Sequence, residues 1–117
     1  MEDIFFPPVC FFCNRYLPVN RKNICTSCWK KLPKFGPIKL SKNKNANRVY
    51  ILYKFEDNVR QLIHLFKYDR FLTLAKYFSE EIFNTYPYLA KNNYSYIIPI
   101  PLHKTRLRER GYNQSYI

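Results

Sequence analysis

The pairs Cys10-Phe11-Phe12-Cys13 and Cys25-Thr26-Ser27-Cys28 decide how the N-terminal part of this sequence folds. Two Cys-x-x-Cys pairs close together are typical of a zinc site, because a two-residue spacer lets both thiolates of a pair turn toward one ion. The intervening residues then bring the second pair round to complete a tetrahedron. Four thiolates leave no open position for water, so the zinc is predicted to be structural rather than catalytic. The predicted ligands are Cys10, Cys13, Cys25 and Cys28.

Disulfide bonds and free buried thiols are the alternatives for these cysteines. Disulfides form in oxidising compartments, and the sequence opens with Met1-Glu2-Asp3, which is acidic where an export signal is positive. The apolar run over residues 4–12 contains two prolines and is too short to span a bilayer. We therefore expect a cytoplasmic protein without membrane insertion. Nearby basic side chains are expected to help keep the thiols deprotonated, namely Arg15, Arg21, Lys22 and Lys30.

The overall composition favours an anionic partner. The chain has 117 residues, with 20 Lys and Arg against 8 Asp and Glu, and a formal net charge of +12. This length excludes a large multidomain enzyme, and such basicity is typical of proteins that meet phosphates. Hydrophobic residues make up 47% of the chain, which is too many for a disordered tail. With only 2 glycines, a Gly-rich phosphate-binding loop is excluded.

Residues 35–48 are predicted to be a linker. Their C-terminal part is rich in Lys and Asn and contains no acidic residue. An arm that contacts nucleic acid is the alternative, but no aromatic residue is interleaved there for base stacking. The predicted organisation is therefore a four-cysteine zinc module over residues 1–34, this linker, and a second domain over residues 49–117.

Hydrophobic patterning predicts strands and helices after the linker. Apolar, β-rich residues at 49–55 and 96–99 predict two strands. A helix that begins near Asp57 is predicted by the helical spacing of Val59, Leu62, Ile63 and Phe66. A second helix is predicted over residues 71–86, with Pro87 ending it. The predicted fold class is α/β.

A basic segment, residues 103–114, follows the second predicted strand. In an open α/β sheet, the loop that leaves the C-terminal end of a strand is where ligands bind. Arginine presents a bidentate fork to phosphate, and a tyrosine can stack on a base. We predict that this loop binds pyrophosphate or nucleic acid, and an exposed basic helix is the alternative. The candidate residues are His103, Lys104, Arg106, Arg108, Arg110, Tyr112, Asn113 and Gln114.

Four features occur along the chain in a characteristic order. The paired cysteine module comes first, and Phe66-Lys67-Tyr68 ahead of Leu74-Ala75 comes second. The third is Ile98 to Lys104 with Arg106 and Arg108, and the fourth is Arg110-Gly111-Tyr112-Asn113-Gln114. Together they resemble the ComF competence-protein family of bacterial phosphoribosyltransferase-like proteins. The resemblance covers essentially the whole chain, and the stretch over residues 101–114 is its most specific part.

The resemblance implies an N-terminal zinc module on a type I phosphoribosyltransferase fold. It also implies a role in taking up single-stranded DNA during natural transformation, with competence-machinery proteins as partners. By the same resemblance, the basic segment matches the loop after the first core strand, which approaches pyrophosphate.

One feature of the family is not present in this sequence. The family's loop for phosphoribosyl pyrophosphate has an acidic pair followed by a turn that contains Thr and Gly. Here Glu56-Asp57 is followed by Asn58-Val59-Arg60, and Gly111 is the last glycine. The chain is therefore expected to be an N-terminal part of such a protein, inactive alone as a transferase. Magnesium and phosphoribosyl pyrophosphate are expected to bind only to a full-length form.

Two other classes of function stay open on the sequence alone. One is a small zinc-dependent module that binds single-stranded nucleic acid and has no enzyme ancestry. The other is a zinc-stabilised module that docks onto proteins. An acidic pair before a Thr- and Gly-containing turn in downstream sequence would favour the ComF interpretation over both.

Overall fold

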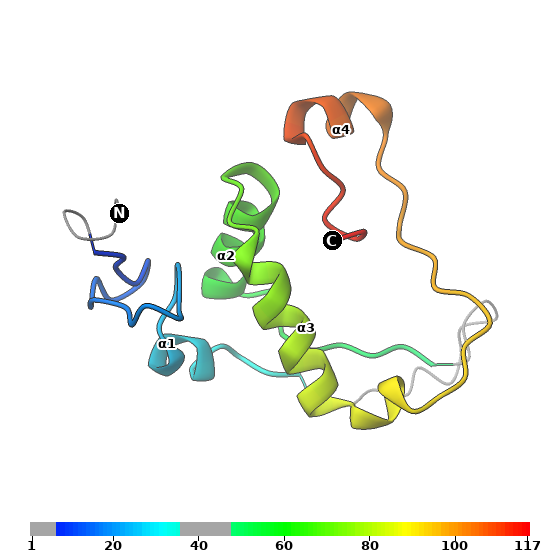
Figure 1. Ribbon diagram of the computed structural model, residues 1–117, viewed down its shortest axis with the longest axis horizontal. Coiled ribbons are helices and arrows are strands. Elements are labelled where there is room, and N and C mark those ends of the chain that lie inside the picture. Colours follow the sequence, from blue (N-terminus) through cyan, green and yellow to red (C-terminus); the bar gives the residue numbers. More distant parts are fainter. Residues whose placement is uncertain (1–6, 36–47) are drawn as a thin grey trace. The chain divides into compact units, whose positions relative to one another are not determined.

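A computed structural model describes residues 7–35 and 48–117 (Figure 1). Backbone contacts divide the chain into two compact units, residues 1–60 and 61–117. The elements in chain order are α1 (Thr26–Lys30), α2 (Asp57–Tyr68), α3 (Thr73–Thr85), the 3-10 helix η2 (Pro87–Ala90) and α4 (Lys104–Arg110). The division between the units falls within α2, and most of the predicted linker lies outside the described residues.

The first unit is built on two loops and the short helix α1. An antiparallel bridge joins Val9 to Tyr16 and closes the first loop. The core of the module lies within residues 17–32, which include α1. Its buried side chains are Leu17, Ile24, Trp29 and Leu32. Burying each such side chain stabilises the fold by roughly 1.5–3 kcal/mol, which is little for so small a core. The module therefore needs the cross-link that a metal ion supplies.

The strand predicted over residues 49–55 is not formed among the described residues. The structure has a single antiparallel bridge there, between Lys34 and Tyr53. Two backbone hydrogen bonds flank it, from the Phe35 N–H to the Leu52 carbonyl at 3.0 Å and from the Lys54 N–H to the Pro33 carbonyl at 2.9 Å. Pro33 has no N–H to extend this pairing, so the contact stays one bridge long.

The second unit is organised around α2 and α3, and both predicted helices are confirmed. Leu62 of α2 and Leu74 of α3 are fully buried. The ring of Phe66 lies 6.3 Å from that of Phe78 and 6.2 Å from that of Tyr112, measured between centroids. The 3.6-residue periodicity of the sequence therefore identified the buried face of α2. In α3 the apolar residues at the expected spacing, Leu72, Ile82 and Phe83, are exposed, and Leu74 and Tyr77 are buried instead.

The strand predicted over residues 96–99 is also absent. Residues 96–102 run as an extended segment from η2 toward α4 (Figure 1), with no backbone-to-backbone hydrogen bond in the part of the chain that the structure describes. A strand exists only when a second strand supplies the complementary donors and acceptors. The described residues are therefore helical with isolated bridges, and the predicted α/β fold class is not supported.

The basic loop predicted after that segment is largely a helix. The Nδ1 atom of His103 accepts a hydrogen bond from the Thr105 N–H at 3.3 Å and so caps α4. Gly111 ends the helix in the left-handed conformation, with φ of 79°, and its N–H donates to the Leu107 carbonyl. A Cβ atom at Gly111 would also lie 3.3 Å from Nη2 of Arg70, so this position favours glycine twice over. The alternative of a basic helix is the one that the structure shows.

Across the two described stretches, every helix is too short or too polar to span a lipid bilayer.

Candidate functional site

The first cysteine pair sits in a tight turn held by backbone hydrogen bonds. The Cys10 N–H donates to the Arg15 carbonyl at 2.8 Å, and the Asn14 N–H donates to the Cys10 carbonyl at 2.9 Å. Asn14 has a positive φ of 56°, which asparagine tolerates better than most residues. The turn directs both thiols of the pair to one side, and Cys10 is fully buried.

The second pair lies at the start of α1. Cys25 is the N-cap residue, and its sulfur accepts a hydrogen bond from the Cys28 N–H at 3.4 Å. Cys28 belongs to the first turn of the same helix. The two loops are tied together by the Phe11 N–H, which donates to the Asn23 carbonyl at 2.8 Å. Together with the hydrogen bond from the Cys25 N–H to the Cys10 sulfur at 3.4 Å, this backbone contact holds the two pairs next to each other.

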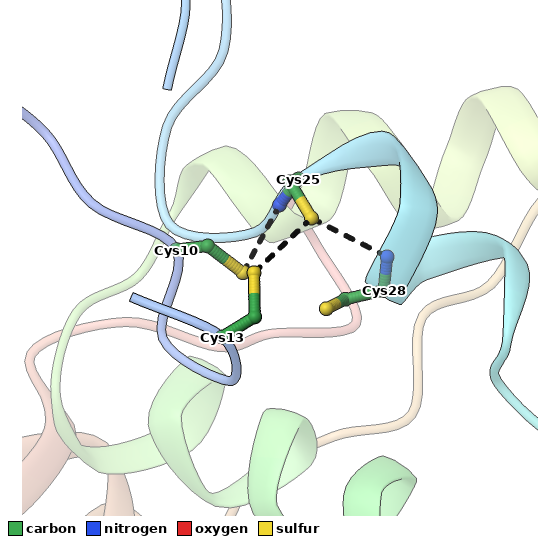
Figure 2. Close-up of side chains that lie close together, drawn as sticks. All are labelled: Cys10, Cys13, Cys25 and Cys28. Atoms are coloured by element: carbon green, nitrogen blue, oxygen red, sulfur yellow. Dashed lines mark hydrogen bonds between the residues drawn. The ribbon is translucent and has the colours of Figure 1, made fainter. Parts of the chain in front are cut away.

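The four sulfurs turn toward a common centre (Figure 2) and lie within 4.8 Å of one another. The sulfurs of Cys13 and Cys25 are 3.7 Å apart, and all four cysteines are free of disulfides. A tetrahedral zinc ion with Zn–S bonds of about 2.3 Å separates its ligands by about 3.8 Å. The cluster therefore has the donor type, number and spacing that zinc requires.

Backbone donors set the charge of the cluster. Burial raises the pKa of the Cys10 thiol, but hydrogen bonds from the backbone N–H groups of Cys25, Cys13 and Phe12 outweigh it and lower that pKa to about 6. The Cys28 N–H lowers the pKa of Cys25. Burial and, to a smaller extent, the neighbouring sulfurs raise the pKa of Cys28 to about 12. The largest lowering effects thus come from the backbone, not from the basic side chains that the sequence suggested.

Zinc at this centre is structural. Its double positive charge would stabilise the fourth thiolate, and the closed set of four sulfur ligands excludes a catalytic water. Residues 1–38 match the family model described as a double zinc ribbon domain. All four cysteines of the chain lie in the matched stretch, and they supply the ligands of one tetrahedral ion. No curated protein and no solved structure matches the chain significantly.

The basic segment divides into exposed and packed side chains. Lys104, Arg106 and Arg108 are exposed on α4. Arg106 pairs with Glu109 at 2.9 Å, and both side chains are more than half exposed, so this ion pair is weak and leaves the guanidinium accessible. These three cations are the part of the segment that a phosphate could reach.

Arg110 is held against α2 within the same unit. Its guanidinium carbon lies 4.9 Å from the centroid of the Tyr68 ring, and its Nη2 donates to the Tyr68 hydroxyl at 3.1 Å. Its Nη1 donates to Oε1 of Gln114 at 3.0 Å. Together these contacts fasten the end of α4 to the end of α2. Arg110 and Gln114 therefore have a structural role in this geometry, and Tyr68 is a partner that the sequence analysis missed.

The side chains of Tyr112 and Asn113 also make contacts within the second unit. The Tyr112 ring packs on Phe66, its hydroxyl is buried, and burial raises its pKa. Nδ2 of Asn113 donates to the Ile100 carbonyl at 2.9 Å, which ties the turn after α4 to the extended segment. Base stacking by Tyr112 stays a prediction, and exposing its ring would first require it to leave Phe66.

Proposed function

We propose that this chain is a zinc-stabilised DNA-handling protein of the ComF type, which acts in DNA uptake. The observation that carries the proposal is the set of exposed cations on α4, Lys104, Arg106 and Arg108, in the stretch whose sequence resembles that family most specifically. The four-cysteine module and the net charge of +12 support it. Single-stranded DNA is the proposed ligand.

The proposal assigns a role to each part of the chain. Residues 1–34 are the zinc module, residues 35–48 the linker, and residues 49–117 correspond to the first part of a phosphoribosyltransferase-like domain. Cysteines that bind zinc rather than form disulfides fit a reducing compartment, so we place the protein in the cytoplasm. Competence-machinery proteins are the proposed partners.

We expect single-stranded DNA binding to depend on α4 and on salt. Each phosphate contact on a single strand releases about 0.7 counterion. Changing Lys104, Arg106 and Arg108 together to glutamine should flatten the log–log dependence of affinity on salt by up to about 2 units. Fluorescence anisotropy of a labelled oligothymidine, titrated over a range of salt concentrations, measures this slope.

Two comparisons make the DNA experiment specific. Changing Lys39, Lys42 and Lys44, which lie outside the described residues, removes the same charge and should leave the slope nearly intact. Tyr112→Ala should lower the affinity with little change in slope if its ring reaches a base, because stacking releases no ions. If the lysine control abolishes the slope while the α4 variant keeps it, α4 is not the DNA site.

We expect this chain not to bind phosphoribosyl pyrophosphate. Binding the ribose and its magnesium requires an acidic pair followed by a small-residue turn whose backbone amides hold the 5-phosphate. The 117 residues contain no such combination. Calorimetric titration with phosphoribosyl pyrophosphate and magnesium should therefore show no saturable heat. Saturable micromolar binding would mean that other residues replace this loop.

Nucleic-acid binding by the zinc module itself is a second candidate. Tyr16 is 76% exposed, and the neighbouring Arg15 side chain is exposed as well. An exposed ring beside a cation suits base stacking with a phosphate contact. If Tyr16→Ala lowers the affinity for oligothymidine and the α4 variant does not, this second function is the correct one.

A further inference from the structure

The extended segment over residues 96–100 of the second unit exposes a row of large apolar side chains. Tyr96 is 85% exposed, Ile97 89%, Ile98 82% and Ile100 75%. Successive residues of an extended chain point to opposite faces, so both faces of this segment are apolar. Such a segment is typical of a strand that another strand and its side chains cover.

The two backbone edges of this segment differ in the N–H donors that they offer. In an extended chain, the N–H and C=O groups of alternate residues point to the same edge. Residues 96, 98 and 100 each keep an N–H and share one edge, whereas the opposite edge carries Pro99 and Pro101, which have none. Only the first edge, which we call the pairing edge, can support a continuous ladder of hydrogen bonds.

An open apolar pocket of about 660 Å³ continues the same surface. Its lining includes Phe83, Leu89, Tyr94, Tyr96 and Ile97, all of the second unit. A fully exposed large side chain presents on the order of 150–200 Å². At the exposures given above, Tyr96, Ile97, Ile98 and Ile100 therefore present on the order of 600 Å², of which strand pairing covers a part, against roughly 800 Å² per partner in a specific interface.

We propose that the pairing edge binds the same edge of a second copy of this chain, antiparallel and centred on Ile98. In this register Ile98 faces Ile98 of the second copy, and Tyr96 faces Ile100 of the second copy. Both prolines then fall at positions where the N–H would point away from the partner, so neither breaks the ladder. The same register carries Leu102 of the second copy to Tyr94, in the wall of the pocket.

Two further observations favour a second copy as the occupant. Residues 92–102 contain no charged side chain, so two copies can approach along this segment despite a net charge of +12. The Ile100 carbonyl already accepts a hydrogen bond from Asn113, but a carbonyl oxygen has two lone pairs and can accept another. Because the proline edge cannot recruit a third strand, the assembly closes at two chains instead of growing into a fibre.

Sedimentation velocity on the zinc-loaded full chain tests the proposal. We expect a monomer–dimer equilibrium with a dissociation constant on the order of 10–100 µM, as for small, weak interfaces. The dimer should strengthen as salt screens the repulsion between the two positively charged chains. A chain that stays monomeric in high salt at concentrations well above this range would overturn the proposal.

Proline substitutions at adjacent residues separate edge pairing from general hydrophobic association. Ile98→Pro removes both central N–H donors of the dimer and should weaken it on the order of 100-fold. Ile97→Pro places the same residue on the edge that prolines already block and should weaken it far less. Ile98→Val keeps the N–H and should dimerise like the wild type. An equal loss of dimer affinity in the two proline variants, or the formation of assemblies larger than a dimer, would contradict pairing on one edge.

Circular dichroism distinguishes lost pairing from lost folding. Ile97 and Ile98 are exposed, so both proline variants should keep the helical signal of the wild type. The DNA and dimer experiments are independent, because α4 carries the cations and residues 96–100 carry none.

Discussion

Replacing Cys10 or Cys25 by serine is expected to release the zinc and unfold the N-terminal module. Structural zinc supplies on the order of 10 kcal/mol or more to small modules, whose cores cannot fold without it. Cys10 is fully buried and its sulfur accepts a hydrogen bond from the Cys25 N–H at 3.4 Å, whereas Cys25 also caps α1. Each substitution therefore removes a ligand and a local backbone contact together. Metal analysis should give about one zinc per wild-type chain and none for either variant.

Amide hydrogen exchange locates the unfolding. Residues between Cys10 and Leu32 should lose their protection in both variants. Ser27→Ala is the matched control, because Ser27 is an exposed residue between two ligands and its side chain is not one of the sulfurs. This control should bind zinc and keep its protection. Mass spectrometry that finds two disulfides and no metal would refute the zinc assignment.

Leu62→Ala is expected to destabilise the second unit strongly. Leu62 lies on the buried face of α2 and is fully inaccessible. Truncating a buried leucine to alanine typically costs about 2–5 kcal/mol, because apolar contacts are lost and a cavity stays behind. The free energy of unfolding of so small a unit is only a few kcal/mol, so this loss is a large part of it. Thermal unfolding, followed by circular dichroism at a helical wavelength, should therefore have a much lower midpoint in the variant.

Leu72→Ala makes the same chemical change at a surface position. Leu72 precedes α3 and is 44% exposed, so its truncation leaves no cavity and should shift the midpoint only slightly. Equal destabilisation by the two variants would mean that α2 and α3 do not pack through Leu62.

Sequence predicted those features that depend on local spacing. The cysteine pairs identified the metal centre because their ligand geometry is set within a few residues, by a turn at Cys10–Cys13 and by the start of α1. Helical periodicity identified α2 and α3 for the same reason, since an apolar face is a property of the helix's own residues.

Features that depend on distant partners could not be predicted in this way. Residues 49–55 and 96–99 have the composition of strands, but a strand also needs a partner that the local sequence does not specify. Arg110 looked like a phosphate ligand, yet its hydroxyl partner Tyr68 lies 42 residues earlier. His103 and Gly111 are the signals that could have identified α4, as an N-cap and a left-handed C-cap.

The position of Trp29 in α1 gives the zinc module an intrinsic optical reporter. Trp29 follows the ligand Cys28 directly, is 6% exposed, and its ring lies edge-on to that of Tyr53 at 5.9 Å. It is the only tryptophan in the chain. Because α1 is capped by Cys25, withdrawing the ion with a chelator would open the helix and expose the indole to water. A shift of its emission to longer wavelength would then follow metal exchange in real time, without any label.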